Sequence, residues 1–346
     1  MAQSSGSKER ASDDTIVGKP GVSINFDAIK NHCNRAPSSR SAVFLTVDTG
    51  YFCHALFVIE AIARSNPRHD FDFCIVTTDI LPDHKLLDRH EVRVCRLALG
   101  AAFASLPSSE RISVASYLRL FVPRVFQDEY DRLLYLDSDI VYRRGDISAL
   151  IQSDLGGRPI AGVREPSQLR RKNFTPDDMT GLGLGFFKMM NAGVQLIDTR
   201  AFNALEVGER AIELAFSKPD KMLAYDQTAL NAVLHGDFAE LSPVWNWLYG
   251  FRTIYYTELY DPAIIHFAGR RKPWNHLNGE FPIKYSNLYR DFYGEHFPEK
   301  LAAMPASAKP SQVKLRHLRY FIKHIVDLGR FLPEMDEFKG DFDIKH

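Results

Sequence analysis

The sequence predicts an α/β fold in which helices flank a mostly parallel central sheet. Apolar runs of strand length alternate with helical patterns between residues 42 and 136, in the order β-α-β-α-β-α-β, which is typical of such a sheet. Carboxylates follow two of the predicted strands directly, at Asp48 and Asp137. Because ligands of these sheets lie beyond the carboxyl ends of the strands, we expect the two positions to share one cleft.

The first half of the chain carries the clearest periodicities. Residues 42–47 are a six-residue run of strand type, and helical spacing of apolar residues follows from Phe52 to Arg64. We expect further strands over 71–77, 91–97 and 133–136, with helices over 81–89 and 111–126 between them. Ser113 is a candidate cap for the last of these helices, and a short helix is expected around 26–32.

The second half alternates less regularly. A strand over 140–142 is followed by a turn and a short helix ending at Gln152. The remaining patterns predict strands over 159–163, 190–198 and 263–267, and helices over 202–216 and 226–234. Residues 166–188 are polar and glycine-rich, which fits either a mobile loop over a site or a long surface connection.

Composition narrows the class of protein. The chain has 346 residues with 45% hydrophobic and 25% charged residues, as in a soluble globular enzyme. Lys+Arg and Asp+Glu balance at 43 each, which argues against nucleic acid as a partner. The glycine-rich fingerprints of dinucleotide-binding and P-loop proteins are absent from the sequence, so those functions lose support.

The cysteines and the N-terminal segment indicate in which cellular compartment the protein resides. The four cysteines have no metal-site spacing, and Cys74 and Cys95 lie in apolar runs typical of buried thiols. Residues 1–40 contain no apolar segment of the signal-peptide kind, and the sequence has no run of 18 apolar residues. We therefore expect a cytoplasmic protein with reduced thiols.

Asp137-Ser138-Asp139 is the most informative triplet of the sequence, because it interrupts an apolar run. Side chains at i and i+2 of an extended chain point the same way, so both carboxylates can converge on one point. Such a pair beside a core is costly without a cation, and carboxylate oxygens suit Mg²⁺ or Mn²⁺. The alternative is a simple turn, which Asp and Ser also favour.

Over residues 42–298 the chain resembles glycosyltransferase family 8, and in particular the bacterial lipopolysaccharide galactosyl- and glucosyltransferases. The motifs that carry the resemblance occur in the family's order. They are Val47-Asp48-Thr49-Gly50-Tyr51, Ser116-Tyr117-Leu118-Arg119-Leu120, Leu134-Tyr135-Leu136-Asp137-Ser138-Asp139, Met190-Asn191-Ala192-Gly193-Val194 with Asp226-Gln227, and His266-x-x-Gly269-x-x-Lys272-Pro273-Trp274.

The resemblance implies a GT-A type fold, with a Rossmann-like central sheet in a single catalytic domain. We expect that domain over 41–298, preceded by a polar and partly disordered extension over 1–40. Residues 299–346 would form a C-terminal amphipathic helical segment and an acidic tail. The implied activity is retaining transfer of galactose or glucose from a UDP-sugar to a saccharide of a bacterial surface glycan, such as lipopolysaccharide.

The resemblance also assigns roles to individual residues. Asp137, Asp139 and His266 would hold Mn²⁺, with Mg²⁺ possible, and two carboxylates with an imidazole suit such an ion. The donor contacts would be Asp48 and Tyr51 at the uridine, Arg119 near the sugar, and Gly269 and Lys272 at the diphosphate. Thr49 and Gly50 stand where relatives carry a second acid and an Asn, and Glu165 stands where they carry an Asp near the acceptor.

Three further residues would contact the donor sugar. Asn191 and Asp226 would hold its hydroxyls, and Gln227 would lie on the face opposite the leaving group. An amide is a poor nucleophile, which favours a front-face mechanism over the double displacement of retaining glycosidases. In this mechanism the departing phosphate takes the acceptor's proton.

Alternatives remain at this level. The chain could be a self-glucosylating primer of the glycogenin type, a non-catalytic nucleotide-sugar binding module, or a hydrolase of nucleotide sugars. His266 could be an ordinary strand-end histidine, Asp226 a helix cap and Asn191 part of a turn. The three tryptophans could be sugar platforms or core residues.

The C-terminal segment has a character of its own. Basic residues alternate with an apolar helical stripe over 313–332, and acidic residues follow over 334–343. Such a helix can lie on an anionic membrane surface, here the inner membrane, or dock on its own catalytic domain.

Overall fold

The structure is a computed structural model, which describes residues 25–109, 113–171, 173–250, 253–275, 281–305 and 314–346. Within these residues nine strands form one sheet, in the order β1-β4-β3-β2-β5-β8-β7-β9-β12, and three form a second, in the order β10-β11-β6. The strands are β1 Lys30–Cys33, β2 Ser41–Thr46, β3 Asp72–Thr77, β4 Arg93–Ala98, β5 Arg132–Leu136, β6 Ile140–Tyr142, β7 Ile160–Arg164, β8 Met190–Asp198, β9 Ala239–Leu241, β10 Trp247–Leu248, β11 Ile264–His266 and β12 Ile344–Lys345.

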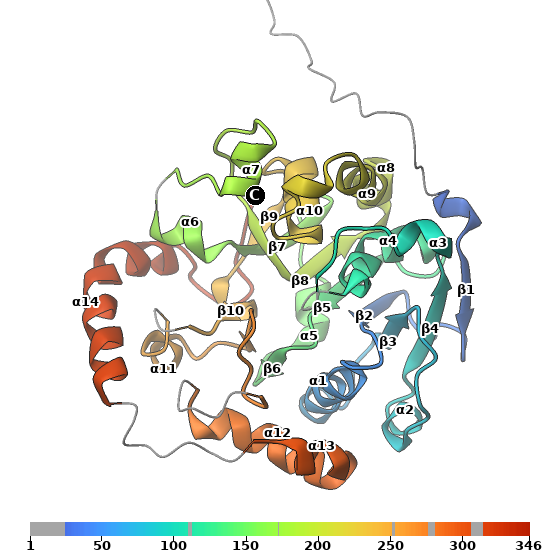
Figure 1. Cartoon of the computed structure of the whole chain (residues 1–346), viewed down its shortest axis with the longest axis horizontal. Coiled ribbons are helices and arrows are strands. Elements are labelled where there is room, and N and C mark those ends of the chain that lie inside the picture. Colours follow the sequence, from blue (N-terminus) through green and yellow to red (C-terminus); the bar gives the residue numbers. More distant parts are fainter. Residues whose placement is uncertain (1–24, 110–112, 172, 251–252, 276–280, 306–313) are drawn as a thin grey trace, which may run out of the picture.

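Helices cover both faces of the large sheet (Figure 1). On one side lie α1, α12 and α13, and on the other lie α4, α8, α9 and α10. The helices are α1 Phe52–Ser65, α2 Lys85–Arg89, α3 Gly100–Phe103, α4 Leu118–Val125, α5 Ile147–Ile151, α6 Pro166–Arg170, α7 Asp177–Gly181, α8 Thr199–Ala204, α9 Val207–Ser217, α10 Asp226–Leu234, α11 Tyr256–Tyr260, α12 Ile283–His296, α13 Pro298–Ala303 and α14 Lys314–Asp336.

The four strands predicted from the first half of the chain are parallel to one another. β2 pairs with β3 and β5, and β3 pairs with β4, all in the parallel sense. The sheet is extended by antiparallel pairs, because β8 runs against both β5 and β7 and β1 runs against β4. The βαβ prediction is confirmed for the half of the sheet that carries Asp48 and Asp137.

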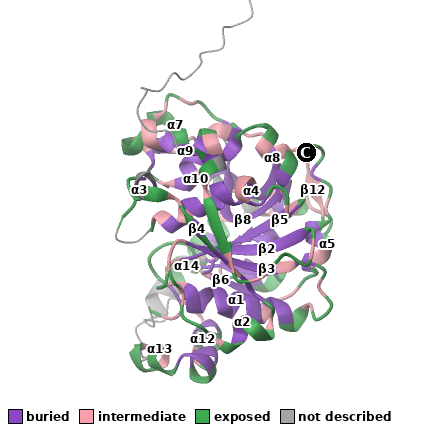
Figure 2. Cartoon of the chain, turned by 90° about the vertical axis from the view of Figure 1, so that its right-hand side faces the viewer, coloured by how far each residue is buried: buried purple, intermediate pink, exposed green. Residues whose placement is uncertain are grey.

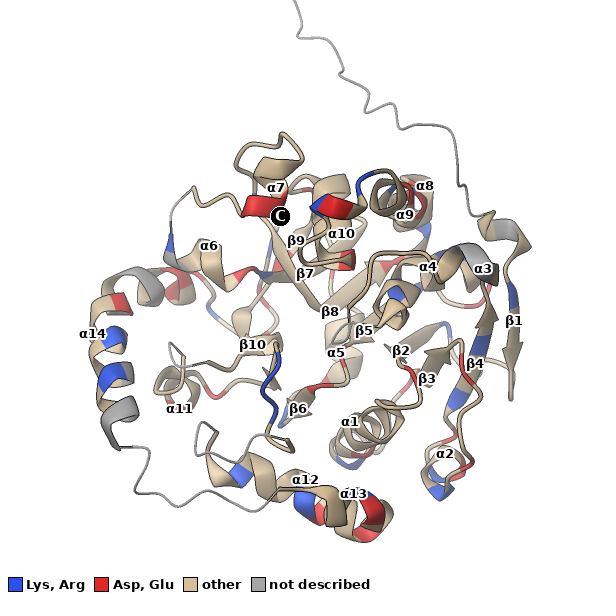
Figure 3. Cartoon of the chain, viewed as in Figure 1, with Lys and Arg blue, Asp and Glu red and all other residues tan. Residues whose placement is uncertain are grey.

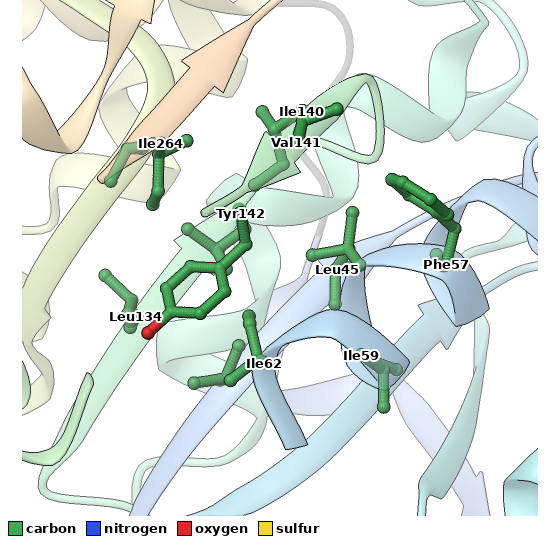
Figure 4. Close-up of a cluster of buried hydrophobic side chains, with 14 of the residues drawn as sticks. Leu45, Phe57, Ile59, Ile62, Leu134, Ile140, Val141, Tyr142 and Ile264 are labelled. Carbon is green, nitrogen blue, oxygen red and sulfur yellow. The ribbon is translucent and has the colours of Figure 1, made fainter. Parts of the chain in front are cut away.

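The alternation of side chains along β2 explains why the core is divided into two. Val43 and Leu45 pack into one apolar cluster and Ala42 and Phe44 into the other, all fully buried. Figure 4 shows part of the first cluster, where Leu45 and residues of α1 meet residues of β6. Figure 2 shows the central strands buried and the outer faces of the helices exposed. The strand ends that carry the site are therefore held by packing on both sides.

Two predicted helices differ from the structure. Residues 26–32 form a 3-10 turn, Phe26–Ala28, and then strand β1, because pairing with β4 in register satisfies the backbone at the sheet edge. The helix expected over 202–216 is divided into α8 and α9 at Glu206, which takes a left-handed backbone conformation with φ of 49°. The predicted cap Ser113 accepts a hydrogen bond from the backbone N–H of Ala115, at the start of a 3-10 turn before α4.

The expectation that Cys95 is a reduced thiol is wrong, because it forms a disulfide with Cys33. The antiparallel register of β1 and β4 sets these residues opposite each other, with their Cα atoms 4.2 Å apart. Cys74 is a free buried thiol as expected, and burial raises its pKa to about 12.

Residues 166–188 and the acidic tail over 334–343 both contain regular structure or contacts with the domain. Residues 166–188 contain the short helices α6 and α7, and residue 172 lies outside the described part of the chain. The acidic tail is attached to the domain, since Arg164 pairs with Glu334 at 2.7 Å and β12 pairs with β9. Among the described residues no helix is long and apolar enough to cross a membrane. Residues 1–24 of the predicted polar extension lie outside the described part of the chain.

Candidate active site

A cavity of about 1100 Å³ opens at the carboxyl ends of β2 and β5. The site residues expected from the sequence all line it, together with Glu165. These residues are Asp48, Tyr51, Arg119, Asp137, Asp139, Asn191, Asp226, Gln227, His266, Gly269 and Lys272. The chain segments that carry them are far apart in sequence, so the fold alone brings them to one place.

Asp137, Asp139 and His266 form a compact group of potential metal ligands, whose ligand atoms lie within 4.8 Å of one another. The antiparallel pairing of β11 with β6 sets His266 opposite Ile140 and so beside the carboxylates. Its Nε2 lies 3.1 Å from Oδ1 of Asp139 and 3.5 Å from Oδ2 of Asp137. Oδ1 of Asp139 is buried and accepts no hydrogen bond of good geometry, which fits a position for a divalent cation.

Lys272 completes the charge balance around these carboxylates. Its Nζ contacts Asp139 and donates to the carbonyl of Phe267 at 2.6 Å, and the side chain is buried. Burial raises the pKa of Asp139, but the positive charges of Lys272 and His266 outweigh it and hold that pKa well below its usual range. Burial lowers the pKa of His266, and the two carboxylates outweigh it in the opposite direction. The pocket therefore favours positive charge beside Asp139.

Arg119 of α4 joins the two acidic parts of the site. Its guanidinium lies 3.1 Å from Oδ1 of Asp137 and 3.0 Å from Oδ2 of Asp226. It also donates to the carbonyl of Ala192 at 2.6 Å and stacks over the ring of Tyr135, whose hydroxyl donates to Asp137. Arg119 lines the cavity, but protein partners already engage its donors, so it acts here as a buried counter-charge.

The alternative of a capping role for Asp226 does not fit the structure. The N-cap position of α10 is Tyr225, and the helix has no side-chain cap. The Asp226 carboxylate faces Arg119 instead, and burial raises its pKa although Arg119 opposes the shift. Gln227 follows, and its Oε1 accepts from the backbone N–H of Ala192 at 3.0 Å and from Nδ2 of Asn191 at 3.2 Å.

Two residues without a predicted role hold the site together. Asn246 donates to Oδ1 of Asn191 at 2.9 Å, and its Oδ1 lies 2.9 Å from Nδ1 of His266. A Cβ atom at Gly193 would lie 2.3 Å from Cε1 of His266 and 2.9 Å from Oδ2 of Asp137. In the sequence, Gly193 belongs to a family motif and Asn246 lies between two tryptophans. Neither fact predicts that these residues contact His266.

The segment that follows β2 lines part of the cavity through Asp48, Gly50 and Tyr51. Asp48 accepts from the backbone N–H of Tyr51 at 3.1 Å, and Thr49 donates through its N–H and its hydroxyl to Asp79, each at 2.9 Å. Burial raises the pKa of Tyr51 to about 12, so its hydroxyl remains a donor at neutral pH. Gly269 has a φ of 92° with open space on its Cβ side, a conformation that favours glycine.

The tryptophans divide between core and cavity. Trp245 and Trp247 are buried, and their indole N–H groups donate to the carbonyl of Asp341 and to Thr257. Trp274 lines the cavity and packs against His54, with ring centroids 4.2 Å apart. Only this last tryptophan is placed to meet a ligand in the cavity.

Comparison with known proteins identifies the family. A sequence model described as glycosyl transferase family 8 matches residues 42–278. The chain belongs to glycosyltransferase family 8. General stress protein A of Bacillus subtilis (strain 168) is 32% identical over 259 residues, which cover 68% of this chain and 85% of that protein. The lipopolysaccharide 1,2-glucosyltransferase of Escherichia coli (strain K12) is 28% identical over 264 residues, 70% and 75% of the two chains.

The fold of this family 8 glycosyltransferase is of the GT-A type. The crystal structure of an active-site mutant of LgtC has a TM-score of 0.61 at 19% identity, covering 74% of this chain and 96% of that one. The galactosyltransferase LgtC in complex with donor and acceptor sugar analogs gives a TM-score of 0.59 at 19% identity, covering 79% and 99%. The predicted family and fold are thus confirmed.

Proposed function

We propose that this glycosyltransferase transfers galactose or glucose, with retention of configuration, from a UDP-sugar to a saccharide of a bacterial surface glycan. The convergence of Asp137, Asp139 and His266 beside Lys272, at one end of the cavity that Gln227 also lines, carries the proposal. Support for the acceptor class comes from the lipopolysaccharide 1,2-glucosyltransferase of Escherichia coli and the 1,3-galactosyltransferase of Salmonella typhimurium, each 28% identical to this chain.

We assign the metal site to Asp137, Asp139 and His266, with Mn²⁺ as the ion and Mg²⁺ as a possible substitute. The bound ion supplies Lewis-acid stabilisation of the charge on the leaving diphosphate. Lys272 adds a second positive charge there, beside the open backbone at Gly269. The uridine would lie against Asp48 and Tyr51, with the Asp48 carboxylate accepting a hydrogen bond from the base; both residues line the cavity.

The proposed mechanism is front-face substitution. Double displacement needs a free carboxylate beneath the anomeric carbon, whereas Asp226 pairs with Arg119 at 3.0 Å and Gln227 is an amide. Asp226 and Asn191 would hold sugar hydroxyls. The Oε1 of Gln227 accepts two hydrogen bonds that fix its position, and we propose that its partial negative charge stabilises positive charge at the sugar. The departing phosphate takes the proton of the acceptor hydroxyl.

Donor turnover tests the proposal directly. UDP release from a panel of UDP-sugars is measured with Mn²⁺, with Mg²⁺ and after chelation. We expect slow, metal-dependent release of UDP from UDP-galactose or UDP-glucose. This release should be abolished in Asp139→Asn, because Asp139 would hold the ion.

The control is Asp88→Asn, which makes the same chemical change at a side chain that is 84% exposed and lies on α2. This variant should match the wild type. No turnover of any donor, together with no metal-dependent binding of UDP, would overturn the proposal.

We further propose that α14 contacts the cytoplasmic face of the inner membrane. The C-terminal part of the helix docks on the domain, where Met335 packs with Leu169 and Trp247. The preceding turns leave large apolar side chains about half exposed. These are Leu318, Phe321, Ile322, Ile325 and Val326. Lys and Arg positions lie along the same helix (Figure 3), which suits anionic lipid.

Vesicle binding checks this contact. Ile325→Glu should lower the affinity for phosphatidylglycerol vesicles, measured by co-sedimentation, about tenfold. The substitution removes apolar burial and adds a charge that the lipid repels. Leu205→Glu is the matched control at an exposed leucine between α8 and α9, and it should bind as the wild type does. Equal binding of wild type and Ile325→Glu would show that the helix does not contact lipid.

A further inference from the structure

The side-chain amides of Gln227, Asn191 and Asn246 form a hydrogen-bonded series that ends at His266. Two backbone N–H groups determine which atom of each amide is the oxygen and which is the nitrogen. The N–H of Ala192 points at one amide atom of Gln227 at 3.0 Å, and the N–H of Gly193 points at one amide atom of Asn191 at 3.1 Å. A backbone N–H can only donate, so both of these side-chain atoms must be oxygens.

The orientation of the remaining groups follows from those two oxygens. Since Oδ1 of Asn191 is an acceptor, the atom of Asn246 that lies 2.9 Å from it must be the donor Nδ2. The other atom of the Asn246 amide is then Oδ1, which lies 2.9 Å from Nδ1 of His266. An oxygen at that distance requires the proton of the imidazole to lie on Nδ1.

This arrangement leaves Nε2 of His266 as the atom that faces Asp139 and Asp137. Asn246 is 1% exposed and His266 is 3% exposed, so bulk water does not compete for these hydrogen bonds. The same amide of Asn191 that Asn246 contacts also donates to Gln227 and to Glu165, at 3.2 and 3.3 Å. Asn246 thus contacts both His266 and Asn191, and Asn191 in turn contacts Gln227.

We propose that Asn246 is a positioning residue that presents Nε2 of His266 to the metal and aligns Asn191 and Gln227 with the donor sugar. This inference rests on the proposed function. The two halves of the amide have separate tasks: Oδ1 accepts from the imidazole, and Nδ2 donates to Asn191. Partners that orient a metal-bound histidine commonly change metal affinity by about ten- to a hundredfold when removed.

Two variants separate these tasks. In Asn246→Ala both contacts are lost, so Mn²⁺ affinity, measured from the signal of free Mn²⁺ in electron paramagnetic resonance, should fall by about ten- to a hundredfold. In Asn246→Asp the acceptor for His266 remains while the donor to Asn191 is replaced by an oxygen. Its Mn²⁺ affinity should stay within about threefold of the wild type, whereas kcat for UDP release should fall by about tenfold.

The matched control is Asn66→Ala. Asn66 makes side-chain hydrogen bonds to Ile62, Tyr142 and Ile147, away from the cavity. This variant should lose stability but keep Mn²⁺ affinity and kcat. Wild-type Mn²⁺ affinity in Asn246→Ala, or equal loss of affinity in both Asn246 variants, would overturn the positioning role. If the wild type itself neither binds Mn²⁺ nor releases UDP, the proposed function fails first and this inference fails with it.

Discussion

Gly193→Ala should reduce metal-dependent UDP release by about a thousandfold and abolish measurable Mn²⁺ binding, because the added methyl group must displace the histidine and a carboxylate that would hold the ion. The new Cβ would lie 2.3 Å from Cε1 and 2.5 Å from Nδ1 of His266, and 2.9 Å from Oδ2 of Asp137. None of these atoms is the end of a flexible side chain, since His266 is held by Asn246 and Asp137 by Arg119.

The backbone cannot relieve this clash at low cost either. Gly193 lies within β8, and its carbonyl accepts from the N–H of Asp137 at 2.8 Å, so the strand and the carboxylate are tied together. The measurements are calorimetric Mn²⁺ titration and donor turnover of purified protein, with thermal unfolding recorded alongside.

Gly294→Ala provides the comparison for this prediction. Gly294 lies in α12, and a Cβ there meets only Leu301 at 3.7 Å, an ordinary contact. We expect unchanged turnover and a stability equal to or up to about 1 kcal/mol above the wild type, since alanine is the better helix former. If Gly193→Ala bound Mn²⁺ and turned over donor as Gly294→Ala does, Asp137, Asp139 and His266 would not be the metal site.

The part of the site that the sequence predicts is the part set by local geometry. Asp137 and Asp139 are two residues apart at the end of an apolar strand, and Asp48 follows another parallel strand, so strand direction alone indicates a shared edge. The family motifs then add His266, Lys272 and the pair Asp226-Gln227, and the structure brings all of them to one cavity.

The part that the sequence does not predict depends on register between distant strands. Position 193 has no room for a side chain, because β8 passes beside His266 of β11. Asn246 has a role only because it lies between His266 and Asn191. The same limit explains the error at Cys95, whose partner is set by the pairing of β1 with β4 across 62 residues. Local propensity carries no information on such contacts.

Arg119→Met should lower the free energy of unfolding by about 3–5 kcal/mol near neutral pH, the largest stability loss that we expect in the site. Arg119 is 6% exposed, and its guanidinium faces the carboxylates of Asp137 and Asp226 at 3.1 and 3.0 Å. Methionine keeps most of the apolar stem but leaves both acids without their cation. The measurement is urea-induced unfolding of wild type and variant, compared as a difference at each pH.

The comparison variant is Arg40→Met. Arg40 pairs with Asp131 at 2.6 Å, but the two side chains are 60% and 65% exposed. A pair so open to solvent contributes little to stability, so this substitution should have little effect. A loss in Arg119→Met no larger than that in Arg40→Met would mean that the guanidinium does not stabilise the two acids.

The loss in Arg119→Met should shrink as the pH falls. Burial already raises the pKa of Asp226 although Arg119 opposes it, so removing Arg119 raises that pKa further. Between the ordinary pKa of an aspartate and the raised one, the folded variant binds more protons than the unfolded chain, so its stability increases as the pH falls through that window. A difference from wild type at about pH 5 that equals the one at about pH 7.5 would mean that Asp226 does not take up the proton, and that Arg119 stabilises the fold by packing rather than by charge.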